Sequence, residues 1–302
     1  MQTGSALLLV LWVIALLSFM VITTLMVVRQ QVETVGARQS VFRARQLAEM
    51  GIAVASHPGI TAIDPLLRSK TSEWEAYEAL ISTEESRLPM RSLLSEQHSA
   101  HLERVLVGWG LTEMEAETLV DRLLDWADED DFVRLKGAER KHYTDEGFQG
   151  RPYNRPLRSA GEVALVAGWE RLVEVRPDWR DWITFHGSGR LDVNEAPAQL
   201  LAAFTGASLT NAEFLVRHRA GLDGLVHTED DEPVATVEEA LAMLGVSSEE
   251  AAALTPLLTV QGATKRIESI GRSGGYARAI VVVVTQDGAR PQMLEWKEYV
   301  PQ

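Results

Sequence analysis

The chain opens with an apolar run that contains no charged residue from Ser5 to Val28. At ~1.5 Å of rise per residue, a helix of about 24 residues extends roughly 36 Å and can cross a hydrocarbon core of about 30 Å. A cleaved secretory signal has a basic start and a shorter apolar core of about 7–15 residues. The run therefore predicts an uncleaved transmembrane helix over residues 5–28, with a conventional signal peptide as the alternative.

The same helix is expected to continue over residues 29–58. Apolar residues recur there at spacings of three, four and six, namely Val32, Val35, Val41, Ala44, Ala48, Ile52 and Ala55. This spacing is typical of a helix with one narrow apolar face, and Pro58 and Gly59 are expected to end it. Such a helix is suited to lateral packing in a helical assembly.

Composition narrows the functions open to the rest of the chain. The 302 residues allow two or three modest domains, and 46% of them are hydrophobic. The formal net charge of −14 argues against a nucleic-acid partner, because phosphate binding needs clustered Lys and Arg. The absence of cysteine excludes disulfides and thiol nucleophiles.

A first helical module is expected over residues 93–187. It contains apolar residues at helical spacing, namely Leu102, Val105, Leu106, Trp109, Leu119, Leu123 and Leu124. Thr112 with Glu115 is a capping-box signal, and Ser159 with Glu162 is a second helix start.

A second helical module is expected over residues 188–258. Asn194 or Asp192 is expected to cap its first helix, with Pro197 in the first turn. Further helices are expected around residues 211–220 and 236–244.

The hydrophobic period changes to that of strands over residues 259–302. Three runs of β-branched and apolar residues, RIESIGR, YARAIVVVVTQ and QMLEWKEYV, are separated by turn signals at Gly274-Gly275 and Asp287-Gly288. Residues 59–92 could hold a first strand or a short helix. A three-stranded sheet needs a cover on one face, which the second half of the opening helix can provide.

The predicted fold class is therefore α+β. A long N-terminal helix packs on a small antiparallel sheet, and a large all-helical insertion interrupts this domain. The helical part is similar to SAM-like and helix-hairpin-helix modules.

One acidic stretch, DWADEDDFVRLKGAERKHY, offers several hard oxygen ligands within about twenty residues, which suits Ca²⁺. The candidate calcium ligands are Asp128, Asp130 and Glu139, with Asp125 and Asp131 in reserve. The stretch is not an EF-hand, because Phe132 stands at the third ligand position. A solvated helix end is the alternative interpretation.

No motif predicts an enzyme. Residues 271–275 read GRSGG and match G-x-S-x-G, but a strand rather than a helix is expected after Ser273, so a turn is predicted. His98 and His101 are three residues apart, and with no third ligand in view they are interpreted as surface residues.

Four stretches together resemble the protein K family of type II secretion systems, whose members are minor pseudopilins. Gly4, followed by Ser5 and an apolar helix, is similar to the processing site of type IV pilin-like proteins. This resemblance implies that the α+β domain with its long N-terminal helix is pilin-like. The family's D-W-x-D-x-D run, G-A-E and aromatic residue correspond to Asp125, Trp126, Asp128, Asp130, Gly137, Ala138, Glu139 and Tyr143. Two further family stretches are matched by Asn154, Pro156, Leu157, Ser159 and Glu162, and by LDVNEAP at residues 191–197.

The resemblance implies that a prepilin peptidase cuts after Gly4 and that Ser5 becomes the mature, methylated N-terminus. Most pilins carry Glu at mature position five, where this chain has Leu9. A Glu in a lipid-embedded helix is costly unless a partner satisfies it, and in pilin-type assembly that partner is thought to be the neighbour's N-terminal amine. A subunit without this Glu can occupy the first position of a filament.

The resemblance also implies calcium binding, the I- and J-type minor pseudopilins as partners, and a role in export of folded periplasmic proteins across the outer membrane. The expected location is the inner membrane, with one span and a periplasmic body. Arg29, Arg38, Arg43 and Arg45 follow the span, which by the positive-inside rule would keep the body cytoplasmic. Leaders of the family usually carry basic residues before the glycine, and residues 1–3 contain none. The true start of the chain is therefore expected to lie upstream of Met1.

Two alternatives stay open. The chain could be an N-terminally anchored periplasmic binding or adaptor protein from outside the pilin class. A helix-hairpin-helix DNA-binding protein is the other, although FTGASLTNAE contains Gly206 without the second glycine of a phosphate-binding hairpin.

Overall fold

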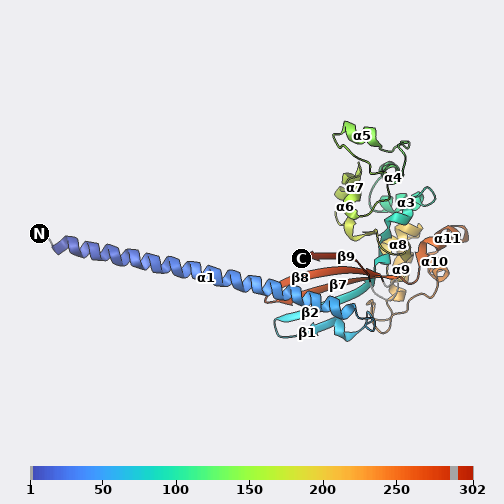
Figure 1. Ribbon diagram of the computed structural model, residues 1–302. Helices are drawn as coiled ribbons and strands as arrows, with labels where there is room; N and C mark the ends of the chain where they lie inside the picture. The colour runs from blue at the N-terminus through green and yellow to red at the C-terminus, as the bar shows by residue number, and fades with distance from the viewer. Residues whose placement is uncertain (1–2, 286–291, 302) are drawn as a thin grey trace.

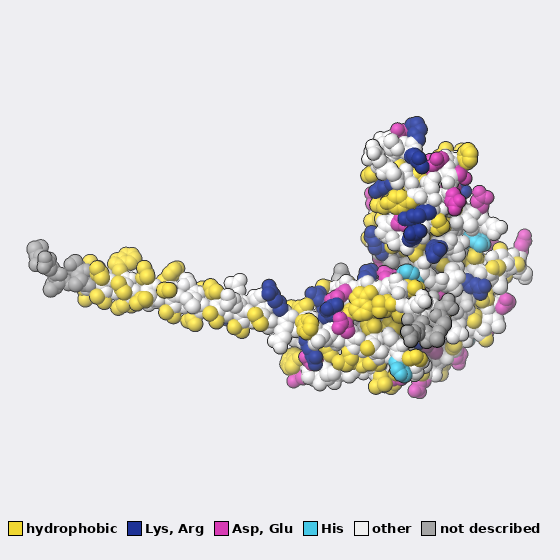
Figure 2. Space-filling model, viewed as in Figure 1, with side chains coloured by type: hydrophobic (Ala, Val, Ile, Leu, Met, Phe, Trp, Pro, Cys, Tyr) yellow, Lys and Arg dark blue, Asp and Glu magenta, His cyan; other side chains and the backbone are white. Residues whose placement is uncertain are grey.

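A single long helix dominates the computed structural model, which describes residues 3–285 and 292–301 (Figure 1). Helix α1 (Thr3–Ala55) projects from the body for much of its length. Between Leu7 and Val28 its large apolar side chains are exposed, and they form a continuous apolar rod in Figure 2. Within the described residues, α1 is the one helix long and apolar enough to cross a membrane.

The C-terminal part of α1 lies on a five-stranded antiparallel sheet with the order β1-β2-β7-β8-β9. The strands are β1 (Arg68–Lys70), β2 (Glu75–Thr83), β7 (Thr264–Ser273), β8 (Tyr276–Thr285) and β9 (Gln292–Tyr299). The three predicted C-terminal strands are confirmed. The sheet is larger than predicted, because β1 and β2 from the mixed segment add to the edge at β7.

The two predicted hairpin turns differ in outcome. Gly274 and Gly275 join β7 to β8 with φ of 55° and 84°, which is the backbone that a tight two-residue turn demands. The turn predicted for the GRSGG stretch is thereby confirmed. Asp287-Gly288 lies outside the described residues.

The predicted apolar face of the helix is divided into a buried and an exposed part. Ala44, Ala48, Ile52 and Ala55 are buried against the sheet, where they meet apolar residues of β2, β7 and β8. Val32 and Val35 lie before the sheet begins and stay exposed. Residues 29–42 of α1, which we call the stem, therefore carry apolar side chains without cover from the described part of the chain.

Small residues allow α1 and β7 to approach closely. A Cβ atom added to Gly271 of β7 would lie 2.0 Å from the Ala44 carbonyl oxygen and 2.5 Å from the Ala48 nitrogen. A Cβ added to Gly51 of α1 would lie 2.1 Å from the Ser269 hydroxyl oxygen. The helix backbone thus rests directly on the strand at this crossing.

A large helical insertion separates β2 from β7. Its helices are α2 (Met90–Leu93), α3 (Ser99–Gly108), α4 (Glu113–Ala127), α5 (Arg140–Asp145), α6 (Ala160–Val163), α7 (Trp169–Val175), α8 (Ala198–Thr205), α9 (Leu209–Arg219), α10 (Val237–Leu244) and α11 (Ser248–Leu254). Short elements complete it: η2 (Glu84–Ser86), η3 (Trp179–Asp181), η4 (Thr255–Leu257), β3 (Leu88–Pro89), β4 (Ile183–Thr184), β5 (Leu191–Asp192) and β6 (Leu258–Thr259). One further turn, η1 (Pro65–Leu67), precedes β1.

One hydrophobic core runs through the whole insertion, from Leu88 to Leu258. Helix α3 packs on both α4 and α8, so the two predicted modules share this core. Its largest fully buried side chains include Trp126, Trp169 and Trp179.

The capping signals have mixed outcomes. The Thr112 hydroxyl accepts from the Glu115 amide at 3.3 Å, and the Glu115 carboxylate accepts from the Thr112 amide at 2.8 Å, as predicted. The predicted cap at Asn194 or Asp192 is wrong, because α8 begins at Ala198 with Pro197 as its N-cap.

The Asn194 side chain connects loops instead of capping a helix. Its amide donates to the carbonyls of Val234 and Val260 at 3.0 and 2.9 Å, so it ties distant loops together.

The crossing of α1 and β7 gives a stability prediction. Gly271→Ala is expected to lower the free energy of unfolding by about 1–3 kcal/mol, because the added methyl group overlaps the backbone of α1. The matched control is Gly36→Ala, which adds the same methyl group to an open position of α1 and should be neutral or stabilising by up to about 1 kcal/mol. Thermal unfolding of the full chain in detergent measures both, and an unchanged midpoint for Gly271→Ala would contradict the packing.

Candidate functional site

The exposed N-terminal half of α1 is the first candidate site. Gly4 and Ser5 lie in its first turn, and Leu9 follows one turn later with 65% of its surface exposed. Further along, Val32, Val35 and Phe42 on the stem are 66%, 63% and 57% exposed. An apolar rod of this length can be covered by lipid over its first part and by other helices over the stem.

The acidic loop between α4 and α5 is the second candidate site, and one arginine organises it. The Arg134 guanidinium donates to Asp125 Oδ1 at 3.1 Å and to Asp128 Oδ2 at 2.8 Å. The Arg134 amide adds a hydrogen bond to Asp125 Oδ2 at 3.2 Å, and Asp125 is fully buried. The negative charges of two predicted ligands, Asp125 and Asp128, are thus partly neutralised by Arg134.

Glycine is required beside this ion pair. A Cβ atom at Gly137 would lie 1.8 Å from Asp125 Oδ2, so any other residue would displace the carboxylate. Neither Arg134 nor Gly137 is among the ligands predicted from the sequence, although Gly137 belongs to the G-A-E motif. Arg134 is a basic residue directly after an acidic run, and this position is the sequence signal that could have indicated its ion pairs.

Glu139 is the least satisfied of the predicted ligands. It is only 6% exposed, and neither of its carboxylate oxygens has a hydrogen-bond partner within the described residues. Burial, and then the charges of Asp125 and Asp128, raise the pKa of Glu139 to about 7. The pKa values of Asp125 and Asp128 are also raised, because burial outweighs the hydrogen bonds from Arg134.

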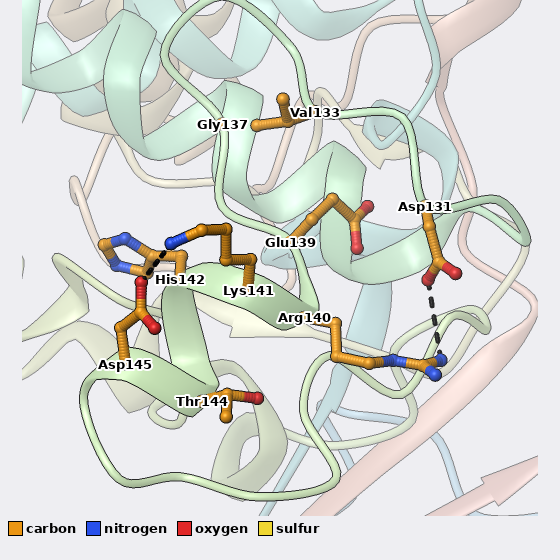
Figure 3. A pocket seen from close by; sticks show the side chains of 9 residues that line it. All are labelled: Asp131, Val133, Gly137, Glu139, Arg140, Lys141, His142, Thr144 and Asp145. Carbon is orange, nitrogen blue, oxygen red and sulfur yellow. Dashed lines mark hydrogen bonds and ion pairs between the residues drawn. The ribbon is translucent and has the colours of Figure 1, made fainter.

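The other two predicted ligands, Asp130 and Asp131, lie at the exposed edge of the acidic loop. Asp130 Oδ1 accepts from the Phe132 amide at 2.8 Å, and Asp131 Oδ1 accepts from the Asn154 side chain at 3.1 Å. Asp131 and Glu139 line an open cavity of about 780 Å³. In Figure 3 their carboxylates lie on the same side of this cavity, with Arg140 paired to Asp131, whereas Lys141 turns toward Asp145.

The donor chemistry of the loop fits a hard cation. Buried carboxylate oxygens without a hydrogen-bond partner occur at Glu139 and at Asp128 Oδ1. Oxygen atoms of this kind are the ligands that Ca²⁺ prefers. Across residues 3–285 and 292–301, however, no three His, Asp or Glu side chains lie close enough together to hold a metal ion.

The two histidines noted in the sequence have separate neighbours. His98 Nδ1 lies 3.0 Å from the Ser92 carbonyl oxygen, and the His101 ring stacks on Phe204 with centroids 5.7 Å apart. Both are partly buried rather than surface residues, because they pack at the start of α3.

A long N-terminal helix laid on an antiparallel sheet, with an apolar half left uncovered, defines a pilin-like protein of the α+β class. The predicted fold class is confirmed by a solved structure, the crystal structure of the GspK-GspI-GspJ complex from the type 2 secretion system of enterotoxigenic Escherichia coli. The match has a TM-score of 0.61 and 14% sequence identity, and it covers 91% of this chain and 99% of the other. At this identity the similarity concerns the fold.

Residues 86–175 match the family model described as type II secretion system (T2SS), protein K. This range contains the acidic loop and the predicted motifs from Asp125 to Glu162. The predicted family is thereby confirmed: the chain carries the protein K domain of the type II secretion system, in the fold of a minor pseudopilin. A comparison with curated protein sequences gave no match.

Proposed function

We propose that this chain is the tip subunit of a type II secretion pseudopilus, which it helps to initiate, and that it thereby supports export of folded periplasmic proteins across the outer membrane. The observation that carries this proposal is the position of the helical insertion. The insertion lies at the end of α1 that is distant from the apolar segment (Figure 1). A further subunit stacked above would collide with it.

Leu9 supports the same position in the filament. A carboxylate buried in lipid has to be satisfied by a partner, and an apolar side chain has no such requirement. A subunit with Leu9 can therefore stand first, without a preceding subunit to pair with.

The proposed partners are the I- and J-type minor pseudopilins, by analogy with the proteins named in the matched complex. The stem is the surface proposed to meet them, because Val32 and Val35 are exposed apolar residues on a helix. Lateral packing of helices would cover these side chains and remove their apolar surface from water.

A pair of stem variants tests this assignment. Val32→Asp/Val35→Asp is expected to reduce co-purification with the I- and J-type subunits at least about fivefold, because an unpaired charge would be buried between helices. The control Gln30→Asp/Thr34→Asp adds the same charges to the opposite face of the helix at 3.6 residues per turn, and should keep the complex. Equal recovery with both double variants would argue against the stem as the contact.

The proposal includes maturation and location. Cleavage after Gly4, methylation of Ser5 and insertion of residues 5–28 in the inner membrane would leave the body in the periplasm. An anchored adaptor protein would need no such cleavage.

Maturation can be read from the mass of the N-terminal peptide. In cells that contain prepilin peptidase, the wild-type chain is expected to begin at methylated Ser5, and Gly4→Val should retain the leader and lose export. Thr3→Ala is the control that should be processed normally. A wild-type chain that begins at Met1, or a processed Gly4→Val chain, would favour the adaptor function.

We also propose that the acidic loop binds calcium. Glu139 and Asp128 would be the principal ligands, because they hold the buried oxygens without partners, and Asp125, Asp130 and Asp131 are the further candidates from the same stretch of sequence. The cation would supply positive charge to a group of five carboxylates, of which three, those of Asp125, Asp128 and Asp131, pair with Arg134 or Arg140.

Calcium is expected to raise the melting temperature relative to chelator, and more at pH 8 than at pH 5.5. The sign follows from the pKa of Glu139 near 7, since a ligand must lose its proton before the cation binds. Glu139→Gln should abolish most of the shift, whereas Glu170→Gln removes an exposed carboxylate of α7 and should preserve it. An identical melting curve with calcium and with chelator at pH 8 would eliminate the site.

A further inference from the structure

A cleft lies where the sheet meets the helical insertion. It has a volume of about 440 Å³ and is lined by residues from β7, β9, the start of α6 and the segment around η3 and β4. We call it the cationic cleft, defined by the side chains of Arg87, Arg158, Arg180, Arg266 and Lys297.

The charge of the cleft is opposite to that of the chain. Five of its fourteen lining residues are Lys or Arg and two are Glu, whereas the whole chain has 29 Lys and Arg against 43 Asp and Glu. A local excess of one sign in a partly enclosed space raises the local concentration of ions of the other sign.

The carboxylates in the cleft are already engaged. Glu84 accepts from the Thr184 hydroxyl at 2.8 Å and lies 3.5 Å from the Arg266 guanidinium. Glu295 pairs with His186 at 3.4 Å, and this pair connects β9 to the insertion.

The remaining cations lack a close counter-ion. Arg87, Arg158, Arg180 and Lys297 form no ion pair within 4 Å in the described part of the chain. Burial and the nearby Arg266 guanidinium lower the pKa of Arg87, which marks a place where a further negative charge is favoured.

The geometry of β9 indicates the shape of the occupant. β9 is the last strand of the sheet order, so its outer edge has no neighbouring strand among the described residues. Glu295 and Lys297 are two residues apart and face the cleft together. An extended peptide that adds to this edge would direct alternate side chains toward the same cleft.

The headgroup of a membrane lipid is a less suitable negatively charged occupant of the cleft than a peptide. The stem separates the apolar segment from the body, and α1 rises roughly 24 Å between Val28 and Ala44. The residues that line the cleft come from the sheet and the insertion, and the insertion lies at the end of α1 distant from the apolar residues in Figure 1.

We propose that the cationic cleft binds carboxylate side chains of an extended acidic segment of a partner protein, which lies along the edge of β9. Arg158 and Arg180 provide accessible charges from the insertion, and Lys297 provides one from the sheet. The segment would therefore contact both parts of the molecule.

The test measures binding of fluorescein-labelled hexaglutamate to the full chain in neutral detergent by fluorescence anisotropy, at about 150 mM salt so that remote charges are screened. Hexaglutamate is expected to bind and hexaglutamine is not. Arg158→Gln/Arg180→Gln should weaken binding at least about tenfold. The control Arg190→Gln/Arg217→Gln removes the same charge from exposed positions outside the cleft and should change binding less than about twofold.

Three outcomes would overturn the proposal. Hexaglutamate could bind no better than hexaglutamine, or both double variants could weaken it equally, which would indicate attraction without a site. Inorganic phosphate or glycerol phosphate could displace the peptide with a higher affinity than the peptide's own, which would assign the cleft to small phosphate anions or lipid headgroups. No pilin-like protein is present in this measurement, so its failure leaves the proposed function standing.

Discussion

The crossing of α1 over β7 is the contact on which the rest of the molecule depends. The apolar segment and the body are joined by this one helix. The body holds it through close approach of the two backbones at Gly271 and through contact of the Gly51 backbone with the Ser269 side chain. Close approach of this kind excludes water and leaves little freedom for the helix to slide. The orientation of the body relative to the apolar segment is therefore set at this crossing.

The elements with local signals could be predicted from the sequence. The capping box at Thr112, the glycine hairpin at Gly274-Gly275 and the β-branched runs of β7 and β8 each depend on a few neighbouring residues. Helix α11 has an equally good capping box at Ser247, so its start is also predictable from neighbouring residues alone. The long helix was predicted because length and apolar character alone constrain it.

The features that depend on distant residues could not be predicted in the same way. Asn194 looks like a helix cap in the sequence, yet its side chain bonds carbonyls 40 and 66 residues away. The acidic loop shows the same limit. Its carboxylates were identified as ligands, but the burial that leaves Glu139 without a partner depends on packing that no local spacing reveals.

The insertion enters and leaves the sheet at one place. Thr83 at the end of β2 pairs with Lys265 near the start of β7, although the whole helical body lies between them in the chain. Glu85 then ties this junction by accepting from the amides of Ser188 and Thr264 at 3.0 and 3.2 Å. Such a graft point lets the helical body change in size or be exchanged over evolution while the strand pairing beneath it stays intact.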